Sequence, residues 1–103
     1  MPRWVDAGAI AELKFDPGAA VCVEGKWLAV FQLEGRFHVI DNACPHASAP
    51  LCDGTVLNGK IICHLHLWEF DIKTGACDVG GDWNVKVYPC RVTKDHLEIA
   101  LPD

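Results

Sequence analysis

The 103-residue chain lacks the long hydrophobic and basic runs that would place it in a membrane or on a nucleic acid. No apolar stretch approaches the roughly 20 residues that a helix needs to cross a bilayer. No run of lysine and arginine is present to neutralise a phosphate backbone, and the formal net charge is −5. These absences predict a soluble protein that binds neither membranes nor nucleic acids.

The N-terminal stretch also lacks the features of a secretory signal. The segment MPRWVDAGAIAEL interrupts its apolar residues with Asp6, Gly8 and Glu12, whereas a signal peptide needs a continuous apolar segment. We therefore expect a cytoplasmic protein whose cysteines stay reduced. Six cysteines in 103 residues are also fewer than a disulfide scaffold uses, so thiols placed with histidines suggest metal binding or catalysis.

Helical periodicity is scarce, and strand-length runs separated by glycine-containing turns recur instead. These runs cover residues 19–25, 26–35, 36–42, 59–65, 68–75, 84–92 and 96–101. Asn58-Gly59 is the strongest hairpin signal, and Glu24-Gly25 and Glu34-Gly35 are suited to close two more hairpins. The only helical candidate is a turn or two around Asp6 to Leu13, where Asp6 is suited to act as the cap and Gly8 disfavours anything longer. The pattern predicts a single all-β domain of small antiparallel sheets, too short to carry a separate catalytic domain.

Soft and borderline metal ligands gather in residues 44–75, which contain three of the six cysteines and three of the five histidines. Two groups stand out, Cys44-Pro45-His46 and Cys63-His64-Leu65-His66, with sixteen residues between His46 and Cys63. Two Cys and two His fit tetrahedral zinc or an iron–sulfur cluster. Zinc fingers usually pair like with like in each knuckle, whereas each loop here offers one Cys and one His. Such mixed loops suit a two-iron site with both thiolates on one iron.

This arrangement resembles that of the Rieske [2Fe–2S] proteins, through C-x-H, sixteen intervening residues and C-x-x-H. The resemblance extends to APLCDG after the first group, GKIIC before the second and WEFDIKTG after it. It implies one [2Fe–2S] cluster per chain, with Cys44 and Cys63 on one iron and His46 and His66 on the other. Because two neutral imidazoles replace two thiolates, the reduction potential is expected to exceed that of an all-cysteine ferredoxin.

The resemblance also implies a fold and a function. The expected fold is a small antiparallel β-sandwich or barrel base, residues 1–43 and 76–103, with a cluster-binding subdomain, residues 44–75, inserted. The chain is similar in size to the small ferredoxins of bacterial multicomponent oxygenases. This implies a monomeric one-electron carrier, itself not an enzyme, that takes electrons from an NAD(P)H-dependent flavin reductase. It would pass them to a terminal aromatic-ring oxygenase by transient docking near the histidine tips.

Two alternative functions fit the same ligands. One is a small Rieske-like subunit of an NAD(P)H nitrite reductase. The other is a zinc-stabilised structural or interaction module, which predicts a colourless protein with one zinc per chain. Metal content separates the second alternative from the cluster, and binding to a large reductase subunit separates the first from the oxygenase carrier.

The second loop departs from the family pattern at His64, where many Rieske sequences carry Pro. We expect His64 to face solvent or to lie behind the ligands, with replacement of His66 as the rival interpretation. Ala49 and Leu65 stand where respiratory Rieske proteins carry a bridging pair of cysteines, and no Ser follows His66 closely. Fewer hydrogen bonds to the cluster favour the low end of the Rieske range, about −150 mV.

The remaining candidate residues have simpler expected roles. Cys22 and Cys90 are expected to be small buried hydrophobes, and Cys52 and Cys77 to be free thiols. The lone histidines are expected at the surface, namely His38 and His96. Three tryptophans are expected to pack in or beside the core, namely Trp4, Trp27 and Trp83. Trp68, two residues after His66, is expected to shield the cluster, with a place on the docking face as the rival interpretation.

Overall fold

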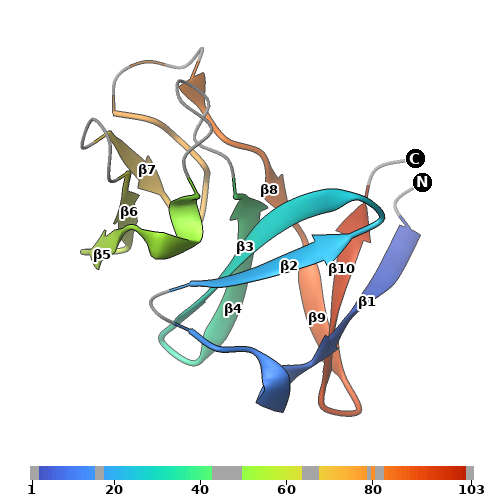
Figure 1. The fold of residues 1–103 in the computed structure, drawn as a ribbon. Coiled ribbons are helices and arrows are strands. Elements are labelled where there is room, and N and C mark those ends of the chain that lie inside the picture. Colours follow the sequence, from blue (N-terminus) through green and yellow to red (C-terminus); the bar gives the residue numbers. More distant parts are fainter. Residues whose placement is uncertain are drawn as a thin grey trace.

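The computed structural model describes residues 3–15, 18–42, 50–63, 68–78, 80 and 83–101. These residues form two 3-10 helices and ten β-strands, and the strands pair into three antiparallel sheets (Figure 1). The predicted all-β antiparallel fold is therefore confirmed. In the part of the chain that the structure describes, no helix is long and apolar enough to cross a bilayer.

Two of the sheets form the base of the molecule. The first has the order β1 (Arg3–Ala9), β10 (His96–Leu101) and β9 (Cys90–Thr93). The second has the order β2 (Ala19–Val23), β3 (Lys26–Leu33), β4 (Arg36–Asp41) and β8 (Val87–Tyr88). Pro89 separates β8 from β9, so the single run expected at residues 84–92 is divided between the two sheets.

The third sheet, called here the small sheet, consists of β5 (Thr55–Leu57), β6 (Lys60–Ile62) and β7 (Glu69–Asp71). A 3-10 helix, Leu51–Asp53, precedes it. Figure 1 shows the small sheet on one side of β3 and β4, with β1, β9 and β10 on the other side. The four-stranded sheet is therefore the middle layer of the molecule.

The helical candidate around Asp6 to Leu13 is only partly correct. Residues 3–9 form the edge strand β1, and only Ile10–Glu12 make a 3-10 turn, without a side-chain cap. The Asp6 carboxylate accepts a hydrogen bond from the Gly8 N–H at 2.8 Å. Gly8 has φ +110° at a register shift in the β1–β10 ladder, a conformation that glycine adopts without strain. Pairing with β10 thus decides the structure of this segment.

The three predicted hairpin turns are confirmed, since each joins paired strands and has positive φ at both central residues. They are Glu24-Gly25, Glu34-Gly35 and Asn58-Gly59. The β9–β10 hairpin uses Lys94 and Asp95, with φ of 51° and 65°. Neither residue is Gly or Asn, so the usual turn signal does not mark this hairpin.

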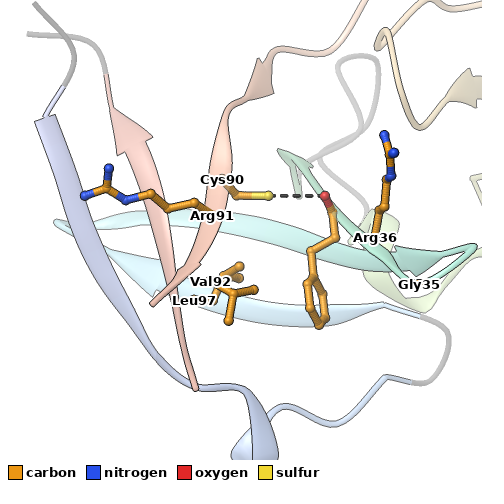
Figure 2. Close-up of a pocket in the computed structure, with 7 residues that line it drawn as sticks. Gly35, Arg36, Cys90, Arg91, Val92 and Leu97 are labelled. Atoms are coloured by element: carbon orange, nitrogen blue, oxygen red, sulfur yellow. Dashed lines mark hydrogen bonds between the residues drawn. The ribbon is translucent and has the colours of Figure 1, made fainter. Parts of the chain in front are cut away.

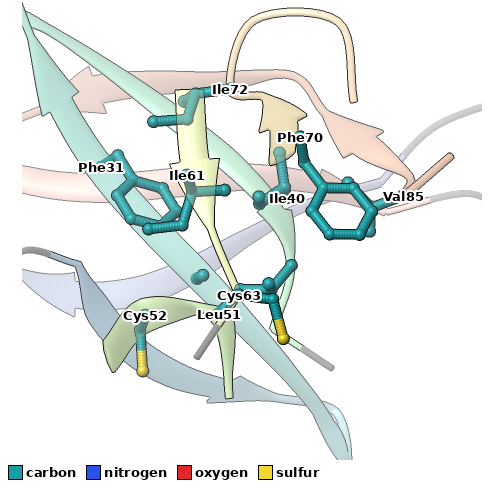
Figure 3. Packing of buried hydrophobic residues seen from close by; sticks show 10 residues of the cluster. Phe31, Ile40, Leu51, Cys52, Ile61, Cys63, Phe70, Ile72 and Val85 are labelled. Atoms are coloured by element: carbon teal, nitrogen blue, oxygen red, sulfur yellow. The ribbon is translucent and has the colours of Figure 1, made fainter. Parts of the chain in front are cut away.

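Buried side chains form two clusters that share the middle layer. The base core contains Ala19, Val21, Val23, Leu28, Val30, Val39, Tyr88, Leu97, Ile99 and Leu101. The small-sheet core contains Ala29, Phe31, Ile40, Leu51, Cys52, Ile61, Cys63, Phe70, Ile72 and Val85 (Figure 3). Successive residues of β3 alternate between the two clusters, as the two-residue period of a strand requires. β3 is therefore buried on both faces over residues 28–31.

The small-sheet core draws Ala29, Phe31 and Ile40 from strands of the base. Val85, near the start of the C-terminal part of the base, also belongs to it. The expected boundaries of the inserted subdomain, residues 44 and 75, stay a prediction. The packing shows that one face of the four-stranded sheet completes the hydrophobic core of the small sheet.

Candidate metal centre

Cys63 is the predicted ligand that the structure describes in full. It follows directly after β6 and is 1% exposed, inside the small-sheet core. Its backbone N–H donates to the Trp68 carbonyl at 2.8 Å. The two residues that flank positions 64–67 are therefore held together. Figure 3 shows the Cys63 sulfur at the edge of the core, pointing away from Ile61 and Ile72.

Asn42 directly precedes positions 43–49 and makes hydrogen bonds to residues that follow them. It is 9% exposed and follows β4. Its carbonyl accepts from the Leu51 N–H at 2.6 Å, and its side-chain Oδ1 accepts from the Cys52 N–H at 2.9 Å. Its own N–H donates to the Trp27 carbonyl at 3.3 Å. Through its backbone and its side-chain amide, Asn42 thus joins β4, β3 and the 3-10 helix Leu51–Asp53.

A close backbone approach brings these two flanking regions together. Gly54, directly after the 3-10 helix, lies so close to the Ile62 carbonyl that a Cβ at position 54 would overlap it. Leu51 and Cys52 pack in the same core as Cys63. The end of the first predicted loop and the start of the second therefore lie at the same side of the small-sheet core.

An aromatic pair covers this part of the core. Trp68 packs against the small-sheet core. Its ring meets the Trp83 ring edge to face, at a centroid distance of 5.4 Å and an interplanar angle of 71°, a favourable geometry for two aromatic rings. Trp83 is 40% exposed. The arrangement supports the expectation that Trp68 shields the region around Cys63 from water.

The other three predicted ligands, Cys44, His46 and His66, lie outside the described residues, as does His64. Among the residues that the structure describes, no group of three or more His, Cys, Asp and Glu side chains could hold a metal ion. The complete ligand set therefore stays a prediction, with Cys63 as its described member.

The donor chemistry fits a two-iron cluster with mixed ligands. Two thiolates would balance the formal +2 charge of an oxidised cluster, so Cys63 as a ligand in an apolar core would carry no uncompensated charge. The buried neighbour Cys52 offers no competing thiolate. Burial, with the charge of Asp53 as a smaller cause, raises the pKa of the Cys52 thiol, and its Sγ lies 3.8 Å from the Asp53 carboxylate. Cys52 and Cys77 are free thiols, as expected.

The two remaining cysteines differ from each other. The prediction that Cys22 is buried is wrong, because it lies on the exposed face of β2, between the buried Val21 and Val23. Cys90 is partly buried against the base core, and its thiol donates to the Phe37 carbonyl at 3.2 Å. Figure 2 shows this hydrogen bond on the wall of a pocket of about 330 Å³ in the base.

The three tryptophans expected in or beside the core are more exposed than predicted. Trp27 is 60% exposed, and Trp4 and Trp83 are each 40% exposed. Trp4 lies on the outer face of β1, where the Arg91 guanidinium stacks over its ring at 4.1 Å. Exposed aromatic rings can thus serve as platforms for a cation or for another ring.

The two lone histidines also differ. His96 is exposed as expected, and its Nδ1 lies 3.1 Å from the Asp6 carboxylate. His38 is only partly exposed, and its Nε2 is buried without a hydrogen-bond partner among the described residues. The surface location expected for His38 is therefore only partly correct.

Asn42 is the structural residue of this site that sequence reasoning missed. Its signal was its position, a polar residue directly after the apolar strand β4 and two residues before Cys44. A buried amide needs partners for its polar groups. Those partners, Trp27, Leu51 and Cys52, come from other elements, so the tertiary structure was needed to identify the role.

Comparison with known proteins gives consistent results. The Rieske [2Fe-2S] domain profile matches residues 3–89. The chain is 36% identical over 100 residues to the ferredoxin component of the naphthalene 1,2-dioxygenase system of Pseudomonas aeruginosa, covering 96% of each protein. Its fold is similar to that of a Sphingomonas yanoikuyae B1 ferredoxin, with 31% identity, a TM-score of 0.84 and coverage of 97% and 100%.

A second solved structure is similar in fold but differs in its described role. It is described as the small subunit of an NADH-dependent nitrite reductase from Mycobacterium tuberculosis. The TM-score is 0.86 at 25% identity, over 100% of this chain and 98% of that one.

Proposed function

Because the chain belongs to the Rieske [2Fe–2S] family, we propose that it carries single electrons from an NAD(P)H-dependent flavin reductase to a terminal aromatic-ring oxygenase. The observation that carries this proposal is the match to a dioxygenase-system ferredoxin over 96% of both proteins. Family membership implies a Rieske-type [2Fe–2S] cofactor, which supplies a one-electron redox couple when bound. The protein is thus an electron-transfer component and not itself a catalyst.

We assign Cys44 and Cys63 to one iron and His46 and His66 to the other. The burial of Cys63, its hydrogen bond to Trp68 and the donor chemistry support this assignment. The residues around Cys63 keep water away from its sulfur, and Asn42 orders the backbone on both sides of positions 43–49. Docking near the two histidines would be weak and reversible, with an interface below about 1,200 Å².

Spectroscopy with metal analysis tests the cofactor directly. Visible absorption and low-temperature electron paramagnetic resonance are recorded on purified protein before and after dithionite. We expect brown protein with two irons per chain and a resonance only in the reduced state. Colourless protein with one zinc per chain would identify the structural module instead.

A ligand exchange tests the site assignment. His66→Cys is expected to keep a cluster and to lower its reduction potential toward the values of all-cysteine ferredoxins, because a thiolate replaces a neutral imidazole. The matched control is His96→Gln, which changes an exposed histidine of β10 and should leave the potential unchanged. A His66→Cys protein with the wild-type potential would refute the assignment.

Reconstitution tests the partners. The protein is added to purified reductase and oxygenase components of a naphthalene dioxygenase system, with NADH as the electron source. We expect oxygenated product only when the cluster-loaded chain is present. The cytoplasmic location and the monomeric state expected from the sequence stay predictions, and gel filtration of the same sample tests the second.

A nitrite reductase subunit is the second candidate function, favoured by the TM-score of 0.86 to the Mycobacterium tuberculosis protein. It predicts stable binding to a large subunit and NADH-dependent consumption of nitrite. If the chain supports nitrite consumption and no ring oxygenation, this candidate replaces the first.

A further inference from the structure

Two tryptophans connect Cys63 with the protein surface. The Cys63 N–H donates to the Trp68 carbonyl at 2.8 Å, and the Trp68 side chain packs against the core that contains Cys63. The Trp68 ring meets the Trp83 ring edge to face, at a centroid distance of 5.4 Å. Trp83 is 40% exposed. A chain of contacts therefore runs from Cys63 to solvent through two aromatic side chains.

The segment that carries Trp83 is held in place by the residues that follow it. The Asn84 side-chain Oδ1 accepts from the Cys77 N–H at 2.8 Å. The Val85 N–H donates to the Gly75 carbonyl at 2.9 Å, and the Val85 side chain is buried in the small-sheet core beside Phe70 (Figure 3). These contacts fix the backbone that presents the Trp83 ring.

Trp4 has the same exposure as Trp83, 40%, in a different setting. It belongs to β1, which Figure 1 shows on the opposite side of the four-stranded sheet from the small sheet. The Arg91 guanidinium lies over its ring at 4.1 Å. A single exposed tryptophan is common on protein surfaces and by itself implies no function. What distinguishes Trp83 is its contact with Trp68, and through Trp68 with Cys63.

This connection bears on electron transfer, because Cys63 is assigned to one of the two irons. Electron tunnelling weakens more slowly through bonded and contacting atoms than across a layer of water, and the two indole rings supply contacting atoms. A planar aromatic electron donor can also pack favourably against an exposed indole ring. The pair thus combines a contact surface for an aromatic donor with a path inward.

We propose that Trp83 is the contact at which a reduced flavin, that of the reductase in the proposed function, passes one electron to the two-iron centre, with Trp68 as the inner link. The flavin loses one electron, the centre gains it, and both indole rings keep their charge and their protons. The inference rests on the proposed function and adds an entry point that belongs to neither cluster histidine.

Stopped-flow kinetics test this contact, with photoreduced flavin mononucleotide as the donor and oxygen excluded. The cluster absorbance, followed at wavelengths where the flavin does not absorb, gives the second-order rate constant of reduction. Trp83→Leu keeps an apolar side chain but removes the ring, and should lower this rate constant at least about threefold, as loss of one aromatic contact predicts. Trp83→Phe keeps a ring and should stay close to wild type. The matched control is Trp4→Leu, which removes an equally exposed tryptophan from the base and should leave the rate constant unchanged.

The reduction potential and the electron paramagnetic resonance spectrum separate electron entry from a structural role. Both should be the same in Trp83→Leu and wild type, because the ligands and the apolar cover of the site are retained. Equal rate constants in Trp83→Leu and wild type would overturn the proposal, as would a loss of rate shared by Trp4→Leu or Trp83→Phe. A shifted potential or a lost cluster in Trp83→Leu would do the same. In each case the wild-type spectrum still reports the centre, so the proposed function would stand, whereas wild-type protein without iron would overturn both.

Discussion

The base and the small sheet are stabilised by different contacts, although both of their cores use side chains of the four-stranded sheet. Strands β1, β2, β3 and β10 are five to eight residues long, whereas each strand of the small sheet has three residues. A three-residue ladder buries little surface on its own. The small sheet therefore depends on contacts outside itself, and the base supplies its own core.

Those contacts are few and specific. Phe31 and Ile40 cover the small sheet from behind, Asn42 holds the 3-10 helix, and Gly54 allows the helix to approach β6. The comparison indicates that the small sheet is held by contacts with other elements more than by its own strands.

Matched truncations of the two cores give the largest expected effect. Phe70→Ala removes a side chain that is 0% exposed in the small-sheet core, and Ile99→Ala removes one that is 0% exposed in the base core. The free energy of unfolding should fall by about 3–5 kcal/mol for Phe70→Ala and by about 2–5 kcal/mol for Ile99→Ala. Urea unfolding followed by circular dichroism and by cluster absorbance measures both.

The two probes should then separate the regions. In Phe70→Ala the cluster absorbance is expected to disappear at lower urea than the circular dichroism, because the small sheet loses its core first. In Ile99→Ala the two transitions should coincide. Coincident transitions in both variants would mean that the regions unfold as one unit, and the comparison drawn above would be wrong.

Two asparagines that each accept a hydrogen bond from the backbone N–H of a cysteine allow a buried bond to be compared with an exposed one. Asn42→Ala leaves the buried Cys52 N–H without its partner at 2.9 Å and should lower the free energy of unfolding by about 1–3 kcal/mol. Asn84→Ala removes a 2.8 Å bond to the Cys77 N–H in an exposed region, where water replaces the lost acceptor. We expect less than about 1 kcal/mol there. Equal losses, or full iron content in Asn42→Ala with unchanged stability, would contradict the role given to Asn42.

Tyr88, the one tyrosine of the chain, gives a pH probe of the base. Its hydroxyl donates to the Asp41 carboxylate at 2.7 Å, and burial, followed by this bond, raises its pKa. The folded state holds the proton more tightly than the unfolded state. The stabilisation is therefore complete below about pH 10, the unfolded pKa of tyrosine, and declines as pH rises above it.

The ultraviolet absorbance of the phenolate follows this titration directly. We expect ionisation of folded protein well above pH 10, and a Tyr88→Phe protein about 1–2 kcal/mol less stable at neutral pH. The stability difference between wild type and Tyr88→Phe should shrink as pH rises above 10. Ionisation near the ordinary value would show that the Asp41 contact does not hold in solution.

The surface ion pair between Arg3 and Glu24 should have the smallest effect. Both side chains are about half exposed and bond at 2.6 and 2.8 Å. Exposed pairs are screened by water and salt. Glu24→Gln is therefore expected to leave the midpoint of thermal unfolding unchanged within error at physiological salt. A shift of several degrees would mean that the edge of the base relies on this pair.

Local chemistry explains which elements could be predicted. The turns at residues 24–25, 34–35 and 58–59 were predictable because positive φ at both central positions selects particular residue types. β1 was missed because its short amphipathic segment becomes a strand only by pairing with β10, some 90 residues later. The exposed positions of Cys22 on β2 and of Trp27 at the start of β3 depended on where the two cores cover these strands.

The sequence by itself determined the all-β class, the main hairpins and the grouping of Cys44, His46, Cys63 and His66, because these rest on residue type and spacing over short distances. Only the tertiary structure decided that β3 is buried on both faces over residues 28–31, that Asn42 joins three elements and that His38 Nε2 is buried without a partner among the described residues. The physical reason is that burial and hydrogen bonding depend on which distant segments meet. That information is spread over the whole chain, so no local pattern contains it.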